Sequence, residues 1–284
     1  MDKLCKRILA VHDITGFGHT SLMAVIPLIY KMGIRVCALP TAVLSANTDY
    51  PEPNIVDLSS YLEPFALHWG KLGMSFDAIH TGFLTSPAQA EQVAAILALL
   101  SADNCLVLVD PVMGDHGELY SCYNADIVPA MRKLVTYADI ITPNYTEAAL
   151  LAGADPILVH ETPVIEQWCR DLSSMGPRQV VITSVPGSKF KYPEIWFYDA
   201  NTDAVTVIAY PRILGVHPGA GDCFAALLLT GIINGYGALN SLNAAAEIMT
   251  RALGTASPAN SDLREGIPLE EVMQWDLLSY YTQA

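Results

Sequence analysis

Short apolar runs alternate along the chain with longer stretches in which apolar residues recur at helical spacing. The runs LVLV at 106–109 and VVIT at 180–183 are continuously apolar, as expected of strands that are covered on both faces. Strands separated by single helices imply right-handed βαβ crossovers and a parallel sheet. We predict strands at 7–11, 35–39, 78–80, 105–109, 140–141 and 180–183. We predict helices at 19–32, 57–72, 86–101, 125–137, 145–153, 163–175, 220–234 and 238–256.

The segment 193–208 has a different pattern. Two strand-like runs flank the polar residues 199–203, which predicts a hairpin and therefore an antiparallel edge. The fold class that follows is α/β, with a mostly parallel central sheet, helices on both faces and this hairpin at one edge. No repeat or linker divides the sequence, so we expect a single domain over residues 1–284.

Composition narrows the classes of function. Apolar residues make up 52% of the chain and charged residues 15%, below the roughly 25% that is typical of soluble domains, so disorder is excluded and a surface covered by a second subunit is indicated. The net charge is −14 and no Lys/Arg run exists, which argues against nucleic-acid or anionic-membrane partners. The apolar run at 223–233 suits a buried helix, not a membrane span. Six cysteines without metal-ligand spacing are typical of free thiols in a reducing cytoplasm.

The residues that leave the strand ends are the first candidates for chemistry, because ligands of open α/β sheets bind at the carboxyl ends of the strands. Asp110 follows the strand at 105–109, and Asp115 returns five residues later. Two carboxylates on one loop repel each other unless a cation or hydrogen-bond donors compensate. A divalent metal with phosphate oxygens is one such compensation, and a solvated turn is the equally weighted alternative.

Two further strand ends carry polar groups. Asn144 and Glu147 stand three residues apart at a helix start, where the favoured interpretation is a capping box. A helix N-terminus also attracts phosphate, so this interpretation does not exclude function. Thr183 and Ser184 follow the last parallel strand and suit either an ordinary turn or hydrogen bonds to phosphate or ribose.

The most distinctive segment is Gly219-Ala220-Gly221-Asp222, which opens a strongly apolar helix. Two glycines allow a ligand to approach the backbone, and the first N–H groups of the helix lack partners, which predicts an anion site without Lys or Arg. Asp222 could act as the N-cap of this helix. A carboxylate beside an anion site is also where a base that deprotonates a substrate hydroxyl would stand. The chain has no GxxxxGK[ST] sequence, so a P-loop ATPase is excluded.

In this order, the segments resemble the ribokinase-like small-molecule kinases and, among them, the pyridoxal (vitamin B6) kinases. The motifs that carry the resemblance are TAVLSANTDY (41–50), TGF (81–83), DPVMGD (110–115), ITPNYTEA (141–148), VVITS (180–184) and GAGDCFAALLL (219–229). The resemblance implies a ribokinase-like three-layer α/β/α fold and ATP-dependent phosphorylation of the 5′-hydroxymethyl group of pyridoxal, pyridoxine or pyridoxamine. It also implies Mg²⁺, ATP as co-substrate and a cytoplasmic homodimer, and it leaves a monovalent cation open.

The resemblance further implies a role for each matching residue. Asp222 would be the general base, and Gly219, Ala220 and Gly221 would hold the γ-phosphoryl group. The nucleotide would be bound by Asp110, Asn144, Glu147, Thr183 and Ser184, and the metal by Asp115 and Glu147. The substrate pocket would be lined by Asp13, Ser45, Thr48 and Phe83.

Two positions depart from the family's pattern. Asp13 stands where many pyridoxal kinases have Ser, and Asn47 replaces the usual His of the segment 45–48. Hydroxymethylpyrimidine kinase of thiamine synthesis is the alternative enzyme, although residues 12–16 match the glycine-rich first loop of those kinases poorly. A non-catalytic vitamin-binding protein on the same fold is the alternative from another class, and the retention of Asp222 argues against it.

Overall fold

A sheet of nine strands, in the order β11-β10-β9-β8-β5-β4-β1-β2-β3, organises the molecule. The computed structural model describes residues 5–102, 104–187, 192–213, 215, 217–255 and 262–282. The parallel strands are β1 (Arg7–Thr15), β2 (Arg35–Leu44), β4 (Ala78–Thr81), β5 (Leu106–Val109), β8 (Ile140–Ile141) and β9 (Gln179–Val185). The predicted hairpin is confirmed as β10 (Glu194–Asp199) and β11 (Ala204–Ala209), which are antiparallel at one edge.

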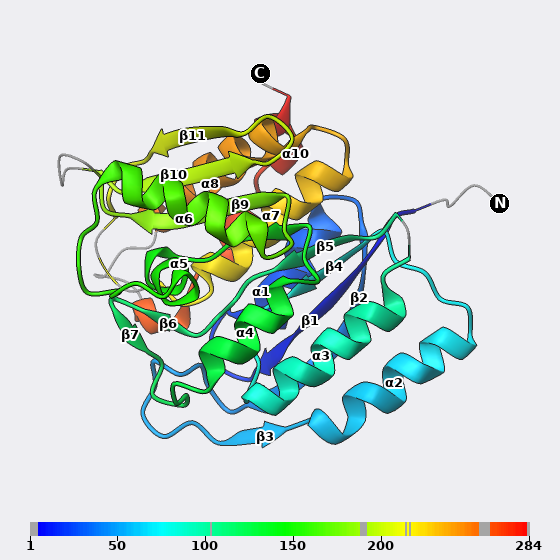
Figure 1. Cartoon of the computed structure of the whole chain (residues 1–284). Helices are drawn as coiled ribbons and strands as arrows, with labels where there is room; N and C mark the ends of the chain where they lie inside the picture. Colours follow the sequence, from blue (N-terminus) through cyan, green and yellow to red (C-terminus); the bar gives the residue numbers. More distant parts are fainter. Residues whose placement is uncertain are drawn as a thin grey trace.

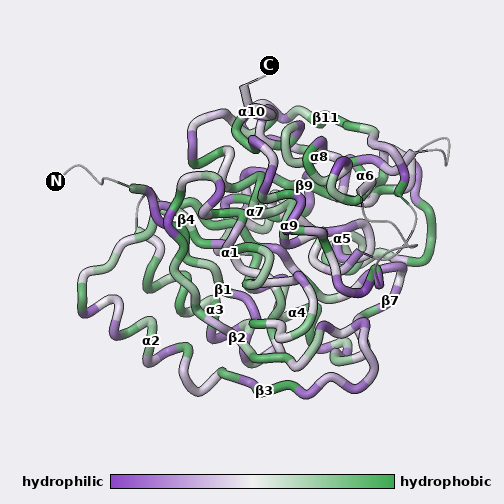
Figure 2. The backbone as a smooth tube through the Cα atoms, turned by 180° about the vertical axis from the view of Figure 1, so that it is seen from behind, coloured by the Kyte–Doolittle hydropathy of each residue, from purple (hydrophilic) through white to green (hydrophobic). Residues whose placement is uncertain are grey.

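Helices cover both faces of the sheet (Figure 1). One face carries α2 (Ser59–Lys71), α3 (Pro87–Leu100), α4 (Ile127–Val135), α5 (Tyr145–Ala152) and α6 (Thr162–Ser174). The other face, seen from behind in Figure 2, carries α1 (Ser21–Lys31), α7 (Ala220–Ile233) and α8 (Ala238–Thr255). Alternate residues of β1 serve the two cores, since Leu9 and Val11 pack in the first and Ile8 and Ala10 in the second. The predicted three-layer α/β/α architecture is therefore confirmed.

The eight predicted helices are present, each with ends within two residues of the predicted ones. The structure adds short elements that the sequence pattern did not predict. They are β3 (Ile55–Asp57), β6 (Gly114–Asp115), β7 (Glu118–Leu119), the 3₁₀ helix η1 (Leu263–Glu265), α9 (Leu269–Val272) and α10 (Leu277–Tyr281). Each is too short for an apolar period to be recognised.

The first two strands are longer than predicted. β1 continues to Thr15, and β2 continues through Pro40 to Leu44. The register between them shifts after the pair formed by His12 and Pro40. Proline has no N–H to donate, and a bulge is one of the few places where a sheet tolerates it. A bulge also redirects the neighbouring side chains, and this one lies beside Asp13, which reaches the cleft described below.

The most apolar segment of the sequence forms α7, whose residues 223–231 are all buried. The prediction of a core helix at this place is therefore confirmed. Along the described ranges, no helix combines the length and the hydropathy that crossing a membrane requires.

Candidate active site

A cleft of about 1270 Å³ lies at the carboxyl ends of the parallel strands, where the N-terminus of α7 also points. Every residue that the sequence placed in the site lines this cleft, with the exception of Ser45. Ser45 is exposed, and its hydroxyl accepts a hydrogen bond from the N–H of Asn54 at 2.9 Å. The structure therefore does not reproduce the predicted position of Ser45 in the substrate pocket.

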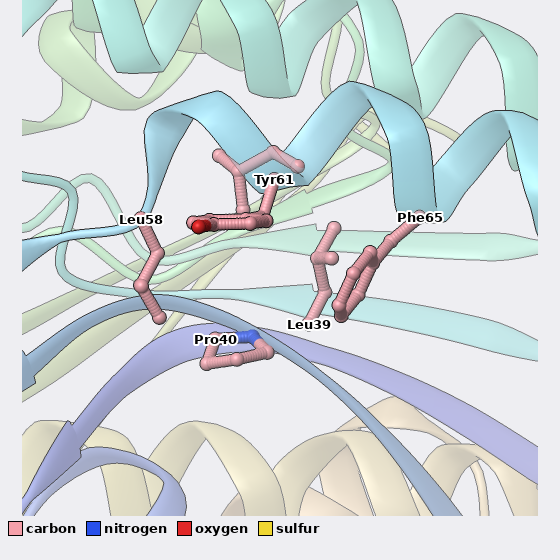
Figure 3. A pocket seen from close by; sticks show the side chains of 6 residues that line it. Leu39, Pro40, Leu58, Tyr61 and Phe65 are labelled. Atoms are coloured by element: carbon pink, nitrogen blue, oxygen red, sulfur yellow. The ribbon is translucent and has the colours of Figure 1, made fainter.

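A smaller hollow of about 350 Å³ lies between β2 and α2 (Figure 3). Tyr61 and Phe65 of α2 lie over Leu39 and Pro40 of β2. Apart from the Tyr61 hydroxyl, these side chains offer no group that could hold a phosphate. The polar chemistry of the molecule is concentrated in the large cleft.

The N-terminus of α7 is not capped by any described side chain. Its N-cap is Gly219, whose φ of 79° lies in the left-handed region that favours glycine. A Cβ at this residue would lie 2.5 Å from the carbonyl oxygen of His19, so the backbone segments touch. The N–H of Ala220 donates to the carbonyl of His217 at 3.2 Å, and that of Cys223 donates to the carbonyl of Gly219 at 2.9 Å. The amides of Gly221 and Asp222 are left as candidate anion donors.

Asp222 is the third residue of α7 and not its N-cap, so its carboxylate is free to serve the cleft. Its Oδ2 accepts a hydrogen bond from the N–H of Ser21 at 2.9 Å, and its Oδ1 lies 3.4 Å from Nδ1 of His12. The side chain of Asp222 is 12% exposed. Ser21 has a φ of 51°, a conformation that residues other than glycine rarely adopt. The carboxylate is thus held from the side of β1 and α1.

Asp110 and Glu147 form a buried acidic pair in the same cleft. Burial raises the pKa of Asp110 well above its ordinary value, and the charges of Glu147 and Asp222 raise it further. Burial also raises the pKa of Glu147 to about 8, against the opposing effect of hydrogen bonds from the N–H groups of Asn144 and Met113. A bound cation would stabilise the ionised form of these carboxylates, so their oxygens form a donor set for a metal ion.

This donor set fits a Mg²⁺ ion that arrives with nucleotide phosphates. In the described part of the chain, no group of three or more His, Cys, Asp or Glu residues is placed to hold a metal ion by itself. Mg²⁺ is usually bound through one or two carboxylates together with phosphate oxygens. Asp115 is exposed at the cleft and lies near enough to raise the pKa of Glu147 by repulsion, so these two residues suit that mode.

The predicted capping box at the start of α5 is confirmed. The side chain of Asn144 accepts the N–H of Glu147, and the side chain of Glu147 accepts the N–H of Asn144, both at 2.9 Å. The Nδ2 of Asn144 also donates to the carbonyl of Gly114 at 2.8 Å. Asn144 therefore fixes the hairpin β6–β7, which carries Asp115, to the N-terminus of α5.

We expect Asn144→Ala to lower the free energy of unfolding by about 1–2 kcal/mol, because the helix loses its cap and the hairpin loses its anchor. In thermal denaturation this should appear as a Tm lower by a few degrees. Asn144→Ser keeps an oxygen that can cap the helix and should recover most of the loss. An unchanged Tm for Asn144→Ala would contradict this account of the capping box.

Asp13 occupies the opposite side of the site, where it is 2% exposed. Its Oδ2 accepts a hydrogen bond from the hydroxyl of Thr15 at 2.9 Å, and that hydroxyl accepts one from Thr20 at 2.8 Å. Burial raises the pKa of Asp13; a hydrogen bond from the Ser21 side chain opposes this, and the charge of Asp222 adds to it. Ser21 therefore acts on both carboxylates, since its backbone N–H donates to Asp222 and its side chain counters the rise in the pKa of Asp13.

Three residues that the sequence did not assign to the site take part in it or shape it. His12 approaches Asp222, as described above. Tyr120 lines the cleft, and burial together with the charges of Glu147 and Asp115 raises the pKa of its hydroxyl, which keeps it a hydrogen-bond donor. Ser21 gave no sequence signal, because its partner Asp222 lies 201 residues further on.

Asn47, the departure from the usual His, is buried and supports a loop. Its Nδ2 donates to the carbonyl of Arg264 at 2.7 Å, and its Oδ1 accepts the N–H of Asp49 at 3.1 Å. The amide thus ties the loop after β2 to the 3₁₀ helix η1. Thr48 and Phe83 line the cleft nearby, and the ring of Phe83 packs against Tyr123 with centroids 5.8 Å apart.

Comparisons with known proteins agree on one family. Residues 67–265 match the family model described as phosphomethylpyrimidine kinase. A Bacteroides thetaiotaomicron protein, described as a candidate phosphomethylpyrimidine kinase and crystallised with pyridoxal, is 36% identical, with a TM-score of 0.91 and coverage of 95% of each chain. Pyridoxal kinase from Lactobacillus plantarum is 31% identical, with a TM-score of 0.87 and coverage of 98% of this chain and 99% of its own.

A pyridoxal kinase of Corynebacterium diphtheriae is 25% identical over 269 residues, which are 89% of this chain and 90% of its own. The family model alone covers well over half of the chain. The ribokinase-like fold implied by the sequence motifs agrees with the nine-stranded sheet and with these structures. The chain therefore belongs to the phosphomethylpyrimidine kinase family.

Proposed function

We propose that this protein is an ATP-dependent vitamin B6 kinase in which Asp222 is the general base. It would transfer the γ-phosphoryl group of ATP to the 5′-hydroxymethyl group of pyridoxal, pyridoxine or pyridoxamine. The observation that carries this proposal is the Asp222 carboxylate, which is fixed by Ser21 beside the uncapped N-terminus of α7. A hydroxyl nucleophile needs a base, and a phosphoryl group in transfer needs an anion site; one cleft offers both.

Each residue has a distinct task in the proposed reaction. Asp222 accepts the proton of the substrate hydroxyl as the hydroxyl oxygen forms its bond to the γ-phosphorus. The bond from that phosphorus to the bridging oxygen breaks, and ADP leaves with the electron pair. The start of α7 holds the phosphoryl oxygens during the transfer, through the N–H groups of Gly221 and Asp222. Positioning and electrostatics supply most of the rate enhancement in phosphoryl transfer.

The nucleotide would lie along the other half of the cleft. Asp110, Asn144, Thr183 and Ser184 line this part of the cleft. Bound with ATP, Mg²⁺ neutralises charge on the phosphate oxygens, and Asp115 and Glu147 would hold it. The resemblance leaves the need for a monovalent cation open, and assays with and without K⁺ would decide it.

The direct test is release of ADP from ATP and Mg²⁺ in parallel reactions with pyridoxal, pyridoxine, pyridoxamine and hydroxymethylpyrimidine. Turnover of a B6 vitamer supports the proposal and ranks the substrates. Hydroxymethylpyrimidine is the second candidate, because the matching family model carries the phosphomethylpyrimidine kinase description. Turnover of that compound alone would keep the chemistry and replace the substrate. Binding of ATP without any turnover would instead favour a vitamin-binding protein.

We expect Asp13→Ser to change the ratio of kcat/KM among the three vitamers. Asp13 lines the cleft at the end of β1, and a buried carboxylate there favours a protonated pyridine ring or an amine-bearing vitamer over the aldehyde. The serine variant should therefore lose more activity on pyridoxamine than on pyridoxal. Steady-state kinetics with all three substrates give the measurement, and equal ratios in both proteins would refute this role of Asp13.

We further propose that the chain is a single kinase domain that works as a homodimer in the cytoplasm. Exposed apolar side chains gather near β3 and α2 and support a covered surface; they include Ile55, Val56, Tyr61 and Phe65. All six cysteines are free, which agrees with a reducing compartment. Sedimentation equilibrium would report the mass of the particle, and a mass of one chain at assay concentration would refute the dimer.

A further inference from the structure

Two histidines are buried against each other next to the proposed base. His12 of β1 and His80 of β4 are both 0% exposed, and their rings lie edge to face with centroids 4.3 Å apart. Among the residues that the structure describes, none of the four ring nitrogens has a hydrogen-bond partner. Burial of a polar group without a partner is costly, so such a pair requires a physical reason.

The ring of His12 is fixed by its surroundings. β1 and β4 are adjacent parallel strands, and His80 lies opposite Ala10, the residue two before His12. The backbone of Gly82 also makes room for the imidazole, since a Cβ there would lie only 2.2 Å from Nδ1. Nδ1 lies 3.4 Å from Oδ1 of Asp222, without the alignment of a hydrogen bond. A small rotation of either side chain would therefore bring this ring nitrogen into a hydrogen bond with the carboxylate.

We propose that His12 is a positioning residue for Asp222. In the substrate complex its Nδ1–H donates to Oδ1 of Asp222, while the N–H of Ser21 donates to Oδ2. Hydrogen bonds of catalytic groups are often long without substrate and shorten in the complex. Two donors from different elements then hold the carboxylate aimed at the substrate hydroxyl. This inference deepens the proposed function and rests on it, because it requires Asp222 to be the base.

The titratable groups that face His12 are Asp222, Asp13 and His80. Burial lowers the pKa of His80 well below its ordinary value, and a charge on His12 lowers it further, so His80 stays neutral. His80 therefore lies against the ring of His12 as a neutral packing partner. Asp13 is the next residue along β1, and its Oδ2 already accepts the hydroxyl of Thr15.

Variants at both histidines separate positioning from packing. His12→Asn keeps an N–H donor near the place of Nδ1, whereas His12→Leu removes it and keeps an apolar side chain. His80→Leu is the matched control, because it alters the buried pair and leaves the donor intact. We expect His12→Leu to lower kcat on the order of 10- to 100-fold with little change in either KM. His12→Asn should recover most of kcat, and His80→Leu should stay within a few-fold of the parent.

A merely structural role predicts a different pattern, in which all three variants lose Tm and active fraction alike, and that pattern would overturn the proposal. An unchanged kcat for His12→Leu would overturn it as well. If His12→Leu does not fold, His12→Gln takes its place in the test, because the glutamine amide reaches the position of Nε2 and not that of Nδ1. A kcat of His12→Gln as high as that of His12→Asn would then refute the hydrogen bond from Nδ1 to Asp222.

A double variant distinguishes this inference from the assignment of the base. In an Asp222→Asn background, His12→Leu should cause little further loss of kcat, because the residue through which it acts is already disabled. A further independent loss of tenfold or more would overturn the positioning role and leave the base in place. Near-parental activity of Asp222→Asn alone would instead remove the base and, with it, the reason for the inference.

Discussion

Asp222→Asn should fold like the parent protein and lose on the order of 10²- to 10⁴-fold in kcat. The amide has the shape of the carboxylate, and its oxygen can still accept the N–H of Ser21, which holds the side chain in the parent. What it cannot do is take the proton of the substrate hydroxyl. The loss should therefore fall on kcat, while the affinity for ADP and the Tm stay close to those of the parent.

The measurement is initial-rate kinetics of ADP release, with ADP binding by calorimetry and Tm as checks on folding. Asp171→Asn makes the same change at an exposed carboxylate of α6 and should leave kcat unaltered. Retention of most of the activity in Asp222→Asn would remove this residue from the mechanism. A parallel loss of ADP binding would point instead to a role of Asp222 in holding the nucleotide.

Gly219→Ala should lower both Tm and kcat, the latter on the order of 100-fold. The φ of 79° is unfavourable for alanine, and the new methyl group would lie 2.5 Å from the carbonyl oxygen of His19 and 3.0 Å from Cα of Thr20. Both neighbours are backbone atoms, so either the N-terminus of α7 or the loop before α1 must move. Either movement displaces the anion site relative to Ser21, which orients the base.

Gly221→Ala is the matched control for the fold. Its Cβ would meet nothing closer than Oδ2 of Asp110 at 3.6 Å, which is an ordinary contact, so its Tm should be that of the parent. Differential scanning calorimetry and the ADP-release assay give the two readouts. If Gly219→Ala kept both Tm and kcat, the close approach of α7 to the β1–α1 loop would be irrelevant to the reaction.

Sequence pattern predicted the elements that are long or uniformly apolar, and the helices and the parallel strands were found in this way. The pattern did not predict several short elements, nor the part of a strand in which polar residues are buried. β3 has three residues, and β6 and β7 have two each. His12 and Asp13 looked like the end of a strand because they are polar, although β1 carries both into the interior.

The candidate site was predictable where its residues are contiguous in a motif, as in the segment 219–222. Contacts between distant segments gave no signal in a single sequence. The bond from Ser21 to Asp222 and the approach of His12 to the same carboxylate are of this kind. The orientation of Ser45 was not predictable either, since its hydroxyl accepts the N–H of Asn54 on a neighbouring segment.

The hydroxyl groups that surround the Asp13 carboxylate come from one short segment, residues 15–21, whereas the groups on the phosphate side come from α5, α7 and the loops before them. The groups that surround Asp13 in the acceptor pocket and the groups that hold the phosphate are therefore encoded in different stretches of the gene. A mutant library confined to residues 13–17 would explore new alcohol acceptors, and it would leave the backbone contact of His19 and Thr20 with Gly219 unchanged. Ser21 also stays outside such a library, because its backbone N–H holds the base.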